Sequence, residues 1–281
     1  MAFLNEAGMN KVKVSVIMPT YNSARFIKPA IESILSQTFQ DFEFIIIDDL
    51  SRDGTLEVLH SYAQRDNRMR IIRNEKYMGL ISSLNRGIRE STGEYIARMD
   101  SDDIAIKDRL EKQALIMETN PDIYALGGAI TYIDASGNEL GVVRHCDLNG
   151  GIKRCPLIHS TVMIRKEILL LNGFHYDEKY RYAEDYFLWL QIARKGKISA
   201  INDVVTKYRL NSNAAKIRYL KRILRATLKV KKDAIFILNI KPAFKDIIVM
   251  LCEAALLLLP AQVILFLYLR KTFGKRTRVI L

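Results

Sequence analysis

Three polar stretches of this 281-residue sequence each follow directly on a short apolar run that is rich in Ile and Val. In chain order they are Pro19-Thr20-Tyr21-Asn22, Asp48-Asp49 and Asp100-Ser101-Asp102-Asp103. Carboxylates gathered in this number repel one another unless a cation or hydrogen-bond donors compensate them. Hard divalent cations such as Mg²⁺ and Mn²⁺ take oxygen ligands, often from one or two carboxylates together with substrate phosphates. The Asp-x-Asp pattern therefore indicates a metal site that handles a phosphorylated ligand.

Each acidic motif also has a purely structural explanation. The Asp-x-Asp stretch would cap the helix that follows it, and Asp48-Asp49 would be a solvated strand end. A third pair, Glu184-Asp185, opens a predicted helix, where negative charge is favourable. Alternatively, this pair supplies a general base that takes a proton from an attacking hydroxyl. The spacing alone leaves these explanations open.

The elements that precede these motifs must bring them together. Through the first hundred residues, apolar runs alternate with helical patterns, which indicates βαβ units and a mainly parallel sheet. Ligands bind at the carboxyl ends of the strands in such sheets, so the three polar stretches should converge on one rim. We expect strands at 14–18, 42–47, 69–73 and 95–99, and helices at 24–37, 55–64, 80–89 and 107–118.

After Pro121 the pattern changes from α/β to α+β, with strands broken by turn residues. We expect a hairpin of strands 125–133 and 139–144, a strand at 161–164, a helix at 184–195 and an edge strand at 198–208. The predicted organisation is an N-terminal extension (1–10), a catalytic α/β domain (11–210) and a helical tail (211–281).

The net charge of +12 is unevenly distributed along the chain. Residues from Lys207 onward carry +14, which leaves −2 for residues 1–206. Because the basic character belongs to the tail, nucleic-acid binding is not expected. The three cysteines, Cys146, Cys155 and Cys252, lack zinc-site spacing and are expected to be free thiols. The first fifteen residues lack the apolar stretch of a secretion signal.

The tail contains a segment, residues 247–269, that is almost wholly apolar and long enough to span a membrane. Glu253 and Gln262 lie inside it, Pro260 divides it, and basic residues flank both ends. Residues 216–232 have the pattern of a basic amphipathic helix, which is typical of helices on anionic membrane surfaces. We favour a monotopic tail bent at Pro260. The alternatives are a single span, or a helical hairpin that packs on the catalytic domain or on a second subunit.

Seven pieces of sequence, in one order over residues 11–210, resemble the inverting GT-A glycosyltransferases of family 2. They are VSVIMPTYN, FIIIDDLSRDGT, MGLISSLNRGI, GEYIARMDSDD, RLEKQ, HSTVMIRK and EDYFLWL. The resemblance implies a Rossmann-like GT-A fold and transfer of a sugar from a nucleotide sugar, with UDP expected as the nucleotide. It also implies inversion at the anomeric carbon and a Mn²⁺ or Mg²⁺ cofactor.

On the nucleotide side, the resemblance implies that Asp48 or Asp49 bonds to the uracil edge. Tyr21, with Pro19 and Asn22, would line the pocket for the base and ribose. Three further positions match the family's pattern and are expected to pack the third helix closely under the nucleotide: Gly79, Asn85 and Gly87.

Around the Asp-x-Asp motif, the resemblance makes Asp102 the metal ligand and places Asp100 on the ribose or on the metal's water shell. Ser101 would lie beside the donor. Arg98 would reach the diphosphate, or would instead pair with the nearby carboxylates.

On the acceptor side, Asp185 matches the family's catalytic base, and Glu184 stands beside it. His159 would contact a phosphate or hydroxyl of the acceptor; a packed, hydrogen-bonded histidine is the alternative. Trp189 is expected in the core. The loops at residues 140–160 and 173–183 would set the specificity, so the donor sugar, the acceptor and the linkage are not predicted.

The expected function is transfer of a single sugar, because the sequence has no QxxRW motif and no multiple spans of the kind found in the family's polymerases. Similar bacterial proteins suggest a polyprenyl-diphosphate-linked acceptor in O-antigen or capsule synthesis, at the cytoplasmic face of the inner membrane. The alternatives are a nucleotidyltransferase, although PTYNSAR lacks the expected glycines, and a non-catalytic membrane-binding module, which leaves the acidic rim unexplained. No GxGxxG follows a predicted strand, which argues against a dehydrogenase.

Overall fold

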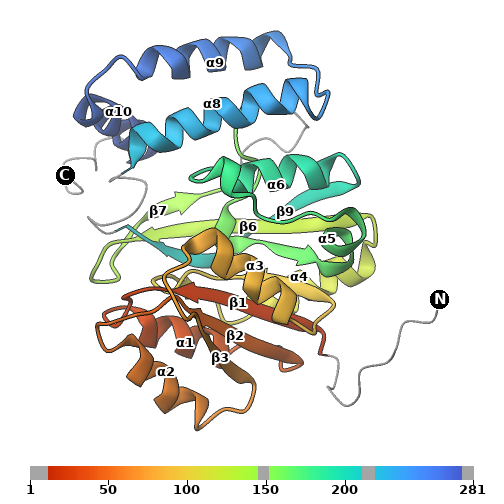
Figure 1. Cartoon of the computed structure of the whole chain (residues 1–281), viewed down its shortest axis with the longest axis vertical. Helices are drawn as coiled ribbons and strands as arrows, with labels where there is room; N and C mark the ends of the chain where they lie inside the picture. The colour runs from red at the N-terminus through yellow and green to blue at the C-terminus, as the bar shows by residue number, and fades with distance from the viewer. Residues whose placement is uncertain (1–11, 145–151, 211–218, 274–281) are drawn as a thin grey trace.

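The computed structural model describes residues 12–144, 152–210 and 219–273, and a single mixed sheet forms its centre (Figure 1). The strands follow the order β3-β2-β1-β4-β8-β6-β9-β5, and β7 pairs with β6 outside this path. Their bounds are β1 Val14–Thr20, β2 Phe42–Asp48, β3 Met69–Arg73, β4 Tyr95–Arg98, β5 Ile104–Ala105, β6 Ile123–Ile133, β7 Glu139–Val143, β8 Met163–Arg165 and β9 Lys197–Arg209.

Helices cover both faces of the sheet. The helix bounds are α1 Ile27–Leu35, α2 Thr55–Ala63, α3 Leu80–Glu90, α4 Arg109–Thr119, α5 Lys166–Asn172, α6 Glu184–Ala193, α8 Leu220–Phe236, α9 Phe244–Leu256 and α10 Ala261–Phe273, with the 3₁₀ helices η1 His159–Thr161 and η2 Glu178–Tyr180. Helices α1, α2 and α4 share a core with Val16 and Met18 of β1. Helices α3, α5 and α6 share a second core with Ile17. Since successive side chains of a strand point to opposite faces, these two cores lie on opposite sides of the sheet.

The first half of the sheet is parallel, as expected. Strand β1 pairs in parallel with β2 and β4, and β2 pairs in parallel with β3. All seven residues of β1 are buried, which is the pattern of a strand covered on both faces. Thr20 lies opposite Asp48, and Arg98 lies opposite Ile17, so the ends of these strands meet at one edge. The predicted rim is therefore present.

The second half is mixed, in keeping with the change from α/β to α+β predicted after Pro121. Strand β8 runs antiparallel to β4 and β6, β7 runs antiparallel to β6, and β5 runs antiparallel to β9, whereas β6 and β9 are parallel. The predicted hairpin accounts for the antiparallel pair of β6 and β7, because a tight turn joins antiparallel strands without a crossover helix. Asp134 N donates to Asn138 O and closes that turn.

Two strand predictions need correction. The strand expected at 161–164 begins only at Met163, because His159–Thr161 form a 3₁₀ turn. Strand β9 was expected at the edge of the sheet, but it pairs with β6 along its length, and β5 covers its other side at Thr206 and Lys207. Gly128 of β6 permits a close approach to β9, since a Cβ there would lie 2.4 Å from Val205 Cγ2.

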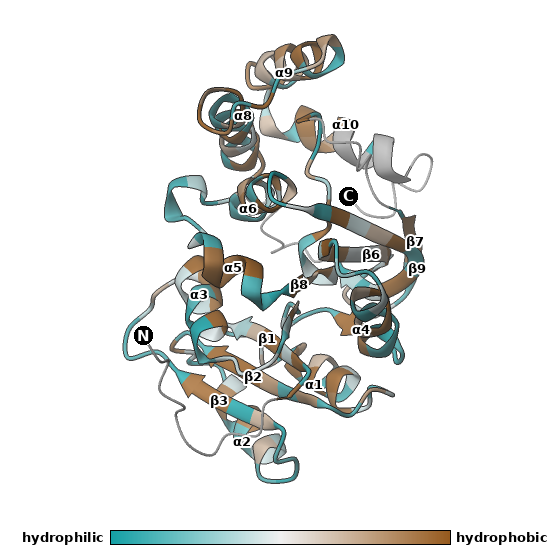
Figure 2. Cartoon of the chain, turned by 90° about the vertical axis from the view of Figure 1, so that its right-hand side faces the viewer, coloured by the Kyte–Doolittle hydropathy of each residue, from teal (hydrophilic) through white to brown (hydrophobic). Residues whose placement is uncertain are grey.

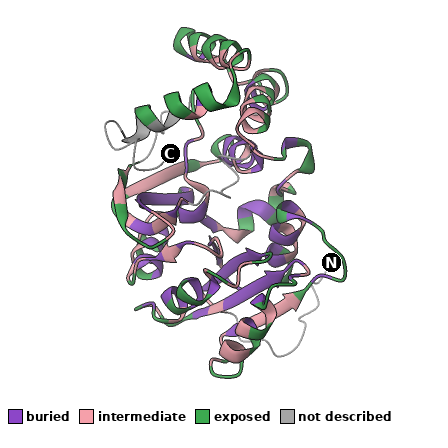
Figure 3. Ribbon diagram, turned by 90° about the vertical axis from the view of Figure 1, so that its left-hand side faces the viewer, coloured by how far each residue is buried: buried purple, intermediate pink, exposed green. Residues whose placement is uncertain are grey.

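The tail packs against the catalytic domain through α8. A third core joins Tyr186 and Phe187 of α6 with Val230 and Ala234 of α8. Pro260 separates α9 from α10, as expected. Among the residues that the structure describes, no helix combines the length and the apolar character needed to cross a bilayer. Figure 3 shows the sheet strands largely buried and α9 and α10 largely exposed.

Some sequence predictions fall outside the described residues. These are the N-terminal extension (1–10), Cys146 and the start of the tail (211–218). Cys155 and Cys252 are free thiols, as expected.

Candidate active site

The loop after β1 is fixed to the loop after β2. Asn22 adopts a left-handed backbone (φ 49°), its N–H donates to Ser51 Oγ (2.9 Å), and its Oδ1 accepts from Arg52 N (2.8 Å). Ser23 N donates to Thr55 Oγ1 (2.8 Å). These bonds fix the loop to the loop after β2, and residues 24–26 form a turn, so α1 begins at Ile27 rather than at residue 24.

Pro19, within β1, and Tyr21, in the loop that follows, have different surroundings. Pro19 is buried inside β1 opposite Ile47. Tyr21 is 47% exposed, and its ring lies edge-on to Tyr77, with 4.9 Å between the ring centroids. The two tyrosines form an exposed aromatic surface at the rim, which suits a flat base or a sugar face.

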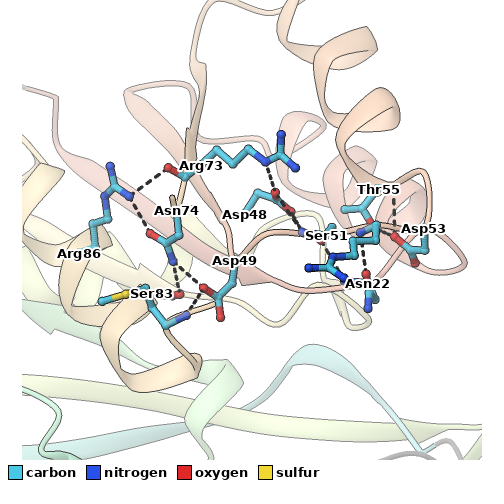
Figure 4. Close-up of polar contacts among 12 residues, drawn as sticks. Asn22, Asp48, Asp49, Ser51, Asp53, Thr55, Arg73, Asn74, Ser83 and Arg86 are labelled. Carbon is cyan, nitrogen blue, oxygen red and sulfur yellow. Dashed lines mark hydrogen bonds and ion pairs between the residues drawn. The ribbon is translucent and has the colours of Figure 1, made fainter. Parts of the chain in front are cut away.

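The two acidic residues after β2 have separate hydrogen-bond partners (Figure 4). Asp49 is 3% exposed and accepts short bonds from Asn74 Nδ2 (2.8 Å), Met78 N (2.7 Å) and Gly79 N (2.7 Å). Asp48 is fully buried, with Arg73 Nε at 3.5 Å. Asp49 therefore fixes the loop between β3 and α3, and contact of either carboxylate with a nucleotide base stays a prediction.

The glycine and asparagine matches around α3 have three different roles. A Cβ at Gly87 would lie 2.4 Å from Ile17 Cγ2, which confirms close packing of α3 on β1. Gly79 instead supplies a turn at φ 84° and an N–H for Asp49. Asn85 bonds to both backbone groups of Tyr176, donating to its O (2.7 Å) and accepting from its N (3.0 Å). Close packing was thus the right prediction for Gly87 alone.

The turn after β4 concentrates negative charge. Both terminal nitrogens of Arg98 donate to the two carboxylate oxygens of Asp100. Of the two roles expected for Arg98, the structure shows the pairing with a nearby carboxylate. Burial, and then the charge of Asp100, raise the pKa of Asp102 to about 6. Asp103 is 1% exposed, and burial followed by Asp100 and Asp102 holds its pKa well above the usual range. A nearby cation would relieve this repulsion.

This turn is also tied to its surroundings. Ser101 Oγ lies 2.8 Å from Ser23 Oγ, which joins the turn to the loop after β1. Arg209 holds it from β9, because its Nε donates to Asp102 O (2.8 Å) and its N–H donates to Asp103 Oδ1 (2.8 Å). Sequence reasoning missed Arg209, whose one signal is a basic residue at the end of a predicted strand.

The RLEKQ piece supplies two further residues whose role the sequence did not reveal. Arg109 is 1% exposed, and its Nη2 donates to Arg98 O (2.8 Å). Burial, and then the charge of Arg98, lower the Arg109 pKa to about 9. Gln113 Nε2 donates to Leu126 O (3.0 Å) and Thr161 O (2.8 Å). The two side chains hold together the ends of β4, β6 and η1 under the rim.

The second acidic pair opens α6. Glu184 is 8% exposed, and its Oε2 lacks a hydrogen-bond partner among the described residues. Burial, and then the charge of Asp185, raise the pKa of Glu184 to about 7. Asp185 is half-buried, its Oδ1 accepts from Tyr186 N (2.8 Å), and Cys155 Sγ lies 3.8 Å from its Oδ2. Asp185 is thus the more accessible carboxylate of the pair.

Tyr176 connects the two acidic sites through packing. Its Oη lies 2.9 Å from His159 Nε2 of η1, and its ring lies 6.5 Å from the ring of Trp189 on α6. Val162, which follows η1, accepts a bond from Arg98 N at the end of β4 (3.0 Å). Burial raises the pKa of Tyr176. The turn after β4 and the start of α6 therefore share one neighbourhood.

His159 takes part in this neighbourhood as a packed, neutral side chain. Its Nε2 lies 2.9 Å from Tyr176 Oη, and its ring contacts Trp189 with 6.0 Å between centroids. Burial, and then Arg98, hold the His159 pKa well below the usual range. This matches the packed, hydrogen-bonded alternative, and Trp189 lies in the core as expected.

The acidic turn fits a metal that shares its coordination with substrate. Among the described residues, no group of three or more His, Cys, Asp or Glu side chains is arranged to hold an ion. Asp102 and Asp100 supply the oxygen ligands that Mg²⁺ and Mn²⁺ prefer. Two carboxylates completed by substrate phosphates are usual for Mg²⁺, so the residues are compatible with the predicted cofactor.

A separate hollow of about 570 Å³ lies beside the rim rather than on it. It is lined by residues of the β3–α3 loop and of one side of α3: Asn74, Glu75, Lys76, Met78, Ser82, Asn85, Arg86 and Arg89. Of the positions that the sequence singled out, Asn85 lines it. Asn74 also connects it to Asp49.

Comparison with known proteins identifies relatives of the chain. Residues 15–169 match the model of the family "Glycosyl transferase family 2". An uncharacterized glycosyltransferase of Haemophilus influenzae is 32% identical over 79% of this chain and 73% of its own. The Escherichia coli "UDP-Glc:alpha-D-GlcNAc-diphosphoundecaprenol beta-1,3-glucosyltransferase WfgD" is 31% identical over 77% of this chain and 85% of its own.

Solved structures share the fold. TarS residues 1–349 from S. aureus, in complex with UDP-GlcNAc, is similar with a TM-score of 0.62 and 23% identity, over 78% of this chain and 66% of that one. The mannosyltransferase PcManGT from Pyrobaculum calidifontis, in complex with GDP-Man and Mn²⁺, is similar with a TM-score of 0.65 and 18% identity, over 96% of this chain and 83% of that one. The mixed sheet with its flanking helices is therefore of the GT-A type.

Proposed function

The chain belongs to glycosyltransferase family 2, and from this we propose that it transfers one sugar from a UDP-sugar to an acceptor hydroxyl, with inversion of the anomeric centre. One observation carries the proposal. Tyr176 contacts Trp189 of α6 and His159 of η1. The residue after η1, Val162, accepts a bond from Arg98 N at the end of β4, so the acidic turn after β4 and the acidic pair that opens α6 belong to one neighbourhood. Donor and acceptor machinery would thus face each other across one site. Family membership argues against the nucleotidyltransferase and the non-catalytic module.

In the proposed reaction, Asp185 accepts the proton of the acceptor hydroxyl. The acceptor oxygen forms a bond to the anomeric carbon while the bond from that carbon to the diphosphate oxygen breaks, and the nucleoside diphosphate leaves. A single displacement inverts the anomeric centre. Glu184 is largely neutral below pH 7, because its pKa is raised to about 7, so it does not repel the charge that Asp185 needs.

The donor would lie on the rim formed by β1, β2 and β4. Tyr21 and Tyr77 offer an aromatic surface for the base, and the loop of Asn22 shapes the pocket edge. Asp102, with Asp100, would hold a Mn²⁺ or Mg²⁺ ion, which neutralises the charge of the departing diphosphate. Arg98, already paired with Asp100, fixes that carboxylate.

We propose a lipid-linked acceptor, an undecaprenyl-diphosphate sugar, in the synthesis of a bacterial surface polysaccharide. The name of WfgD states such an acceptor for that relative. The reaction would then take place at the cytoplasmic face of the inner membrane. Transfer of labelled sugar into an organic-extractable product tests this acceptor class against free sugars of the same structure.

The donor class is tested by release of nucleoside diphosphate from a panel of UDP-, GDP- and TDP-sugars, with Mn²⁺ or with EDTA. We expect one donor to be turned over with Mn²⁺, and we expect EDTA or Asp102→Ala to abolish that turnover. Ser136→Ala, at the exposed turn between β6 and β7, is the matched control and should keep activity. Turnover that is equal with Mn²⁺ and EDTA would contradict the metal-dependent reaction.

A further inference from the structure

Helix α9 exposes its apolar side and turns its carboxylates toward the protein. Its exposed side carries large apolar residues one helical turn apart, whereas a helix on a soluble core buries such residues. All of α9 is described, and of its exposed residues only Lys245 is charged. The exposed apolar residues of α9 and of the turn that follows it include Phe244 (76% exposed), Ile247, Ile248, Leu251 (65%) and Leu258 (86%).

The carboxylates of α9 face the protein instead. Asp246 is 4% exposed and accepts a bond from Ala243 N (2.9 Å). Glu253 pairs with Lys231 of α8, whose Nζ lies 2.7 Å and 2.8 Å from its two oxygens. The Lys231 side chain is fully buried and also donates to Lys153 O (2.9 Å). The contact between Lys231 and Glu253 fixes the rotation of α9 about its own axis, so the apolar side of α9 faces away from α8.

The catalytic domain holds the tail in place. Val230 and Ala234 of α8 pack on α6, and Tyr180 Oη donates to Asp233 Oδ2 (3.0 Å). Lys229 Nζ donates to Lys179 O (2.9 Å). Helix α6 begins with the proposed base, so the tail belongs to the side of the molecule where the acceptor would enter (Figure 1).

Helix α10, the next helix along the chain, also contains apolar residues in the part that the structure describes (Figure 2). Val263, Phe266 and Leu267 are each more than two-fifths exposed. Together with the exposed apolar residues of α9 and Leu258, they form what we call the α9–α10 face. Basic residues that are exposed around it are Lys241, Lys245 and Arg270.

Charge identifies what this face would meet. The acidic residues of the described tail, Asp233, Asp246 and Glu253, all bond inward. The exposed charged residues of the described tail are Arg222, Arg225, Lys229, Lys232, Lys241, Lys245 and Arg270, and all of them are basic. Exposed apolar residues together with exposed charges that are all basic are complementary to a bilayer with anionic headgroups. Large exposed apolar side chains in this number on two helices are unusual in a soluble monomer.

We propose that the α9–α10 face is seated in the surface of an anionic membrane, parallel to its plane. Each of the two helices has 13 residues and so measures about 20 Å, which is shorter than the hydrocarbon core of about 30 Å. The membrane contact thus falls on α9 and α10, whereas the basic amphipathic segment expected to lie on the membrane is largely α8, which packs on α6. Seated in this way, the α9–α10 face would bring the enzyme to a lipid-linked acceptor, and this role rests on the proposed function.

Vesicle co-sedimentation of the full chain tests this proposal. We expect binding to vesicles of phosphatidylcholine with phosphatidylglycerol that is much stronger than binding to phosphatidylcholine alone. Ile248→Glu with Leu251→Glu should weaken binding by about tenfold or more, because two apolar side chains that would enter the bilayer surface become charged. Leu115→Glu, at a 59% exposed leucine of α4, is the matched control and should leave binding unchanged.

Two measurements separate this proposal from its rivals. If light scattering finds a dimer that the Ile248→Glu/Leu251→Glu variant dissociates, and vesicles are not bound, the face covers a second copy of the chain and the proposal is overturned. Equal binding by the variant and by native protein would also overturn it. Release of nucleoside diphosphate without vesicles, from the same samples, reports on the proposed function independently of membrane binding.

Discussion

Glu184 and Asp185 are sequence neighbours with unequal surroundings. Among the described residues, one oxygen of the buried Glu184 has no hydrogen-bond partner, whereas Asp185 is half-buried. Burial, and then the charge of Asp185, raise the pKa of Glu184 to about 7, so Glu184 keeps its proton to a higher pH than an ordinary glutamate does.

This arrangement predicts a pH-dependent stability difference. The pKa of Glu184 is about 7 in the folded protein, against an ordinary value of 4.5, so its proton stabilises the fold. That stabilisation is complete below pH 4.5 and is lost as the pH rises through 7. Glu184→Gln keeps the group neutral. The variant should therefore gain stability relative to native protein as pH rises, by up to about 3 kcal/mol at pH 8.

Chemical unfolding at pH 5 and at pH 8 measures this difference. Glu178→Gln removes a glutamate charge at an exposed position of η2 and serves as the control, for which we expect no such trend. A difference between Glu184→Gln and native protein that stays the same at both pH values would show that Glu184 is not held neutral by burial.

The sequence predicted the acidic residues of the site but not the residues that hold them. Asp102 and Asp185 follow recognisable local patterns. Arg209 reaches the Asp-x-Asp turn from a strand more than a hundred residues away, and Gln113 binds two carbonyl groups of distant segments. Such contacts depend on tertiary packing, which periodicity and motif spacing do not encode.

At the scale of elements, α3 lies against β1 at a distance set by Gly87. A methyl group at that position would meet Ile17 Cγ2 at 2.4 Å, inside the sheet core. Gly87→Ala should lower the free energy of unfolding by about 1–3 kcal/mol, because overpacking outweighs the better helix propensity of alanine. Thermal unfolding checks this. Ser82→Ala, half-exposed on the same helix, should change little, and equal effects of the two substitutions would contradict the packing role.

The strands predicted best were those defined by their own sequence. Runs such as FEFIII are buried on both faces, so their composition alone marks them, and β3 was predicted with both ends correct. The errors fell where pairing decides the outcome. Strand β9 is not an edge because the two residues of β5 pair with it. Helix α1 starts late because residues 24–26 form a turn, before which Ser23 N donates to Thr55 across the rim.

At the scale of the molecule, specific hydrogen bonds that involve side chains of α8 join the tail to the catalytic domain. Lys231 bridges α8, α9 and the backbone of Lys153. Lys231→Met should leave the Glu253 carboxylate unpaired in the interface and destabilise the protein by about 2–4 kcal/mol. The double variant Lys231→Met/Glu253→Met should recover to within about 1 kcal/mol of native protein.

Chemical unfolding, together with trypsin cleavage of the tail, measures this coupling. Lys232→Met, at an exposed position of the same helix, is the control for loss of one charge. Equal destabilisation by the single and the double variants would mean that the pair does not fix α9 to α8, and the orientation of the α9–α10 face would lose its support.

The assignment of Asp185 as the base is tested most directly by measuring nucleoside diphosphate release and donor affinity together on Asp185→Asn. We predict that turnover falls by about 10²–10⁴-fold, because no base is left to take the proton from the acceptor hydroxyl. The donor dissociation constant should change less than about twofold. Asp122→Asn, the same substitution at an exposed aspartate before β6, should match native protein in both measurements. Native-like turnover by Asp185→Asn would contradict a site in which the start of α6 activates the acceptor.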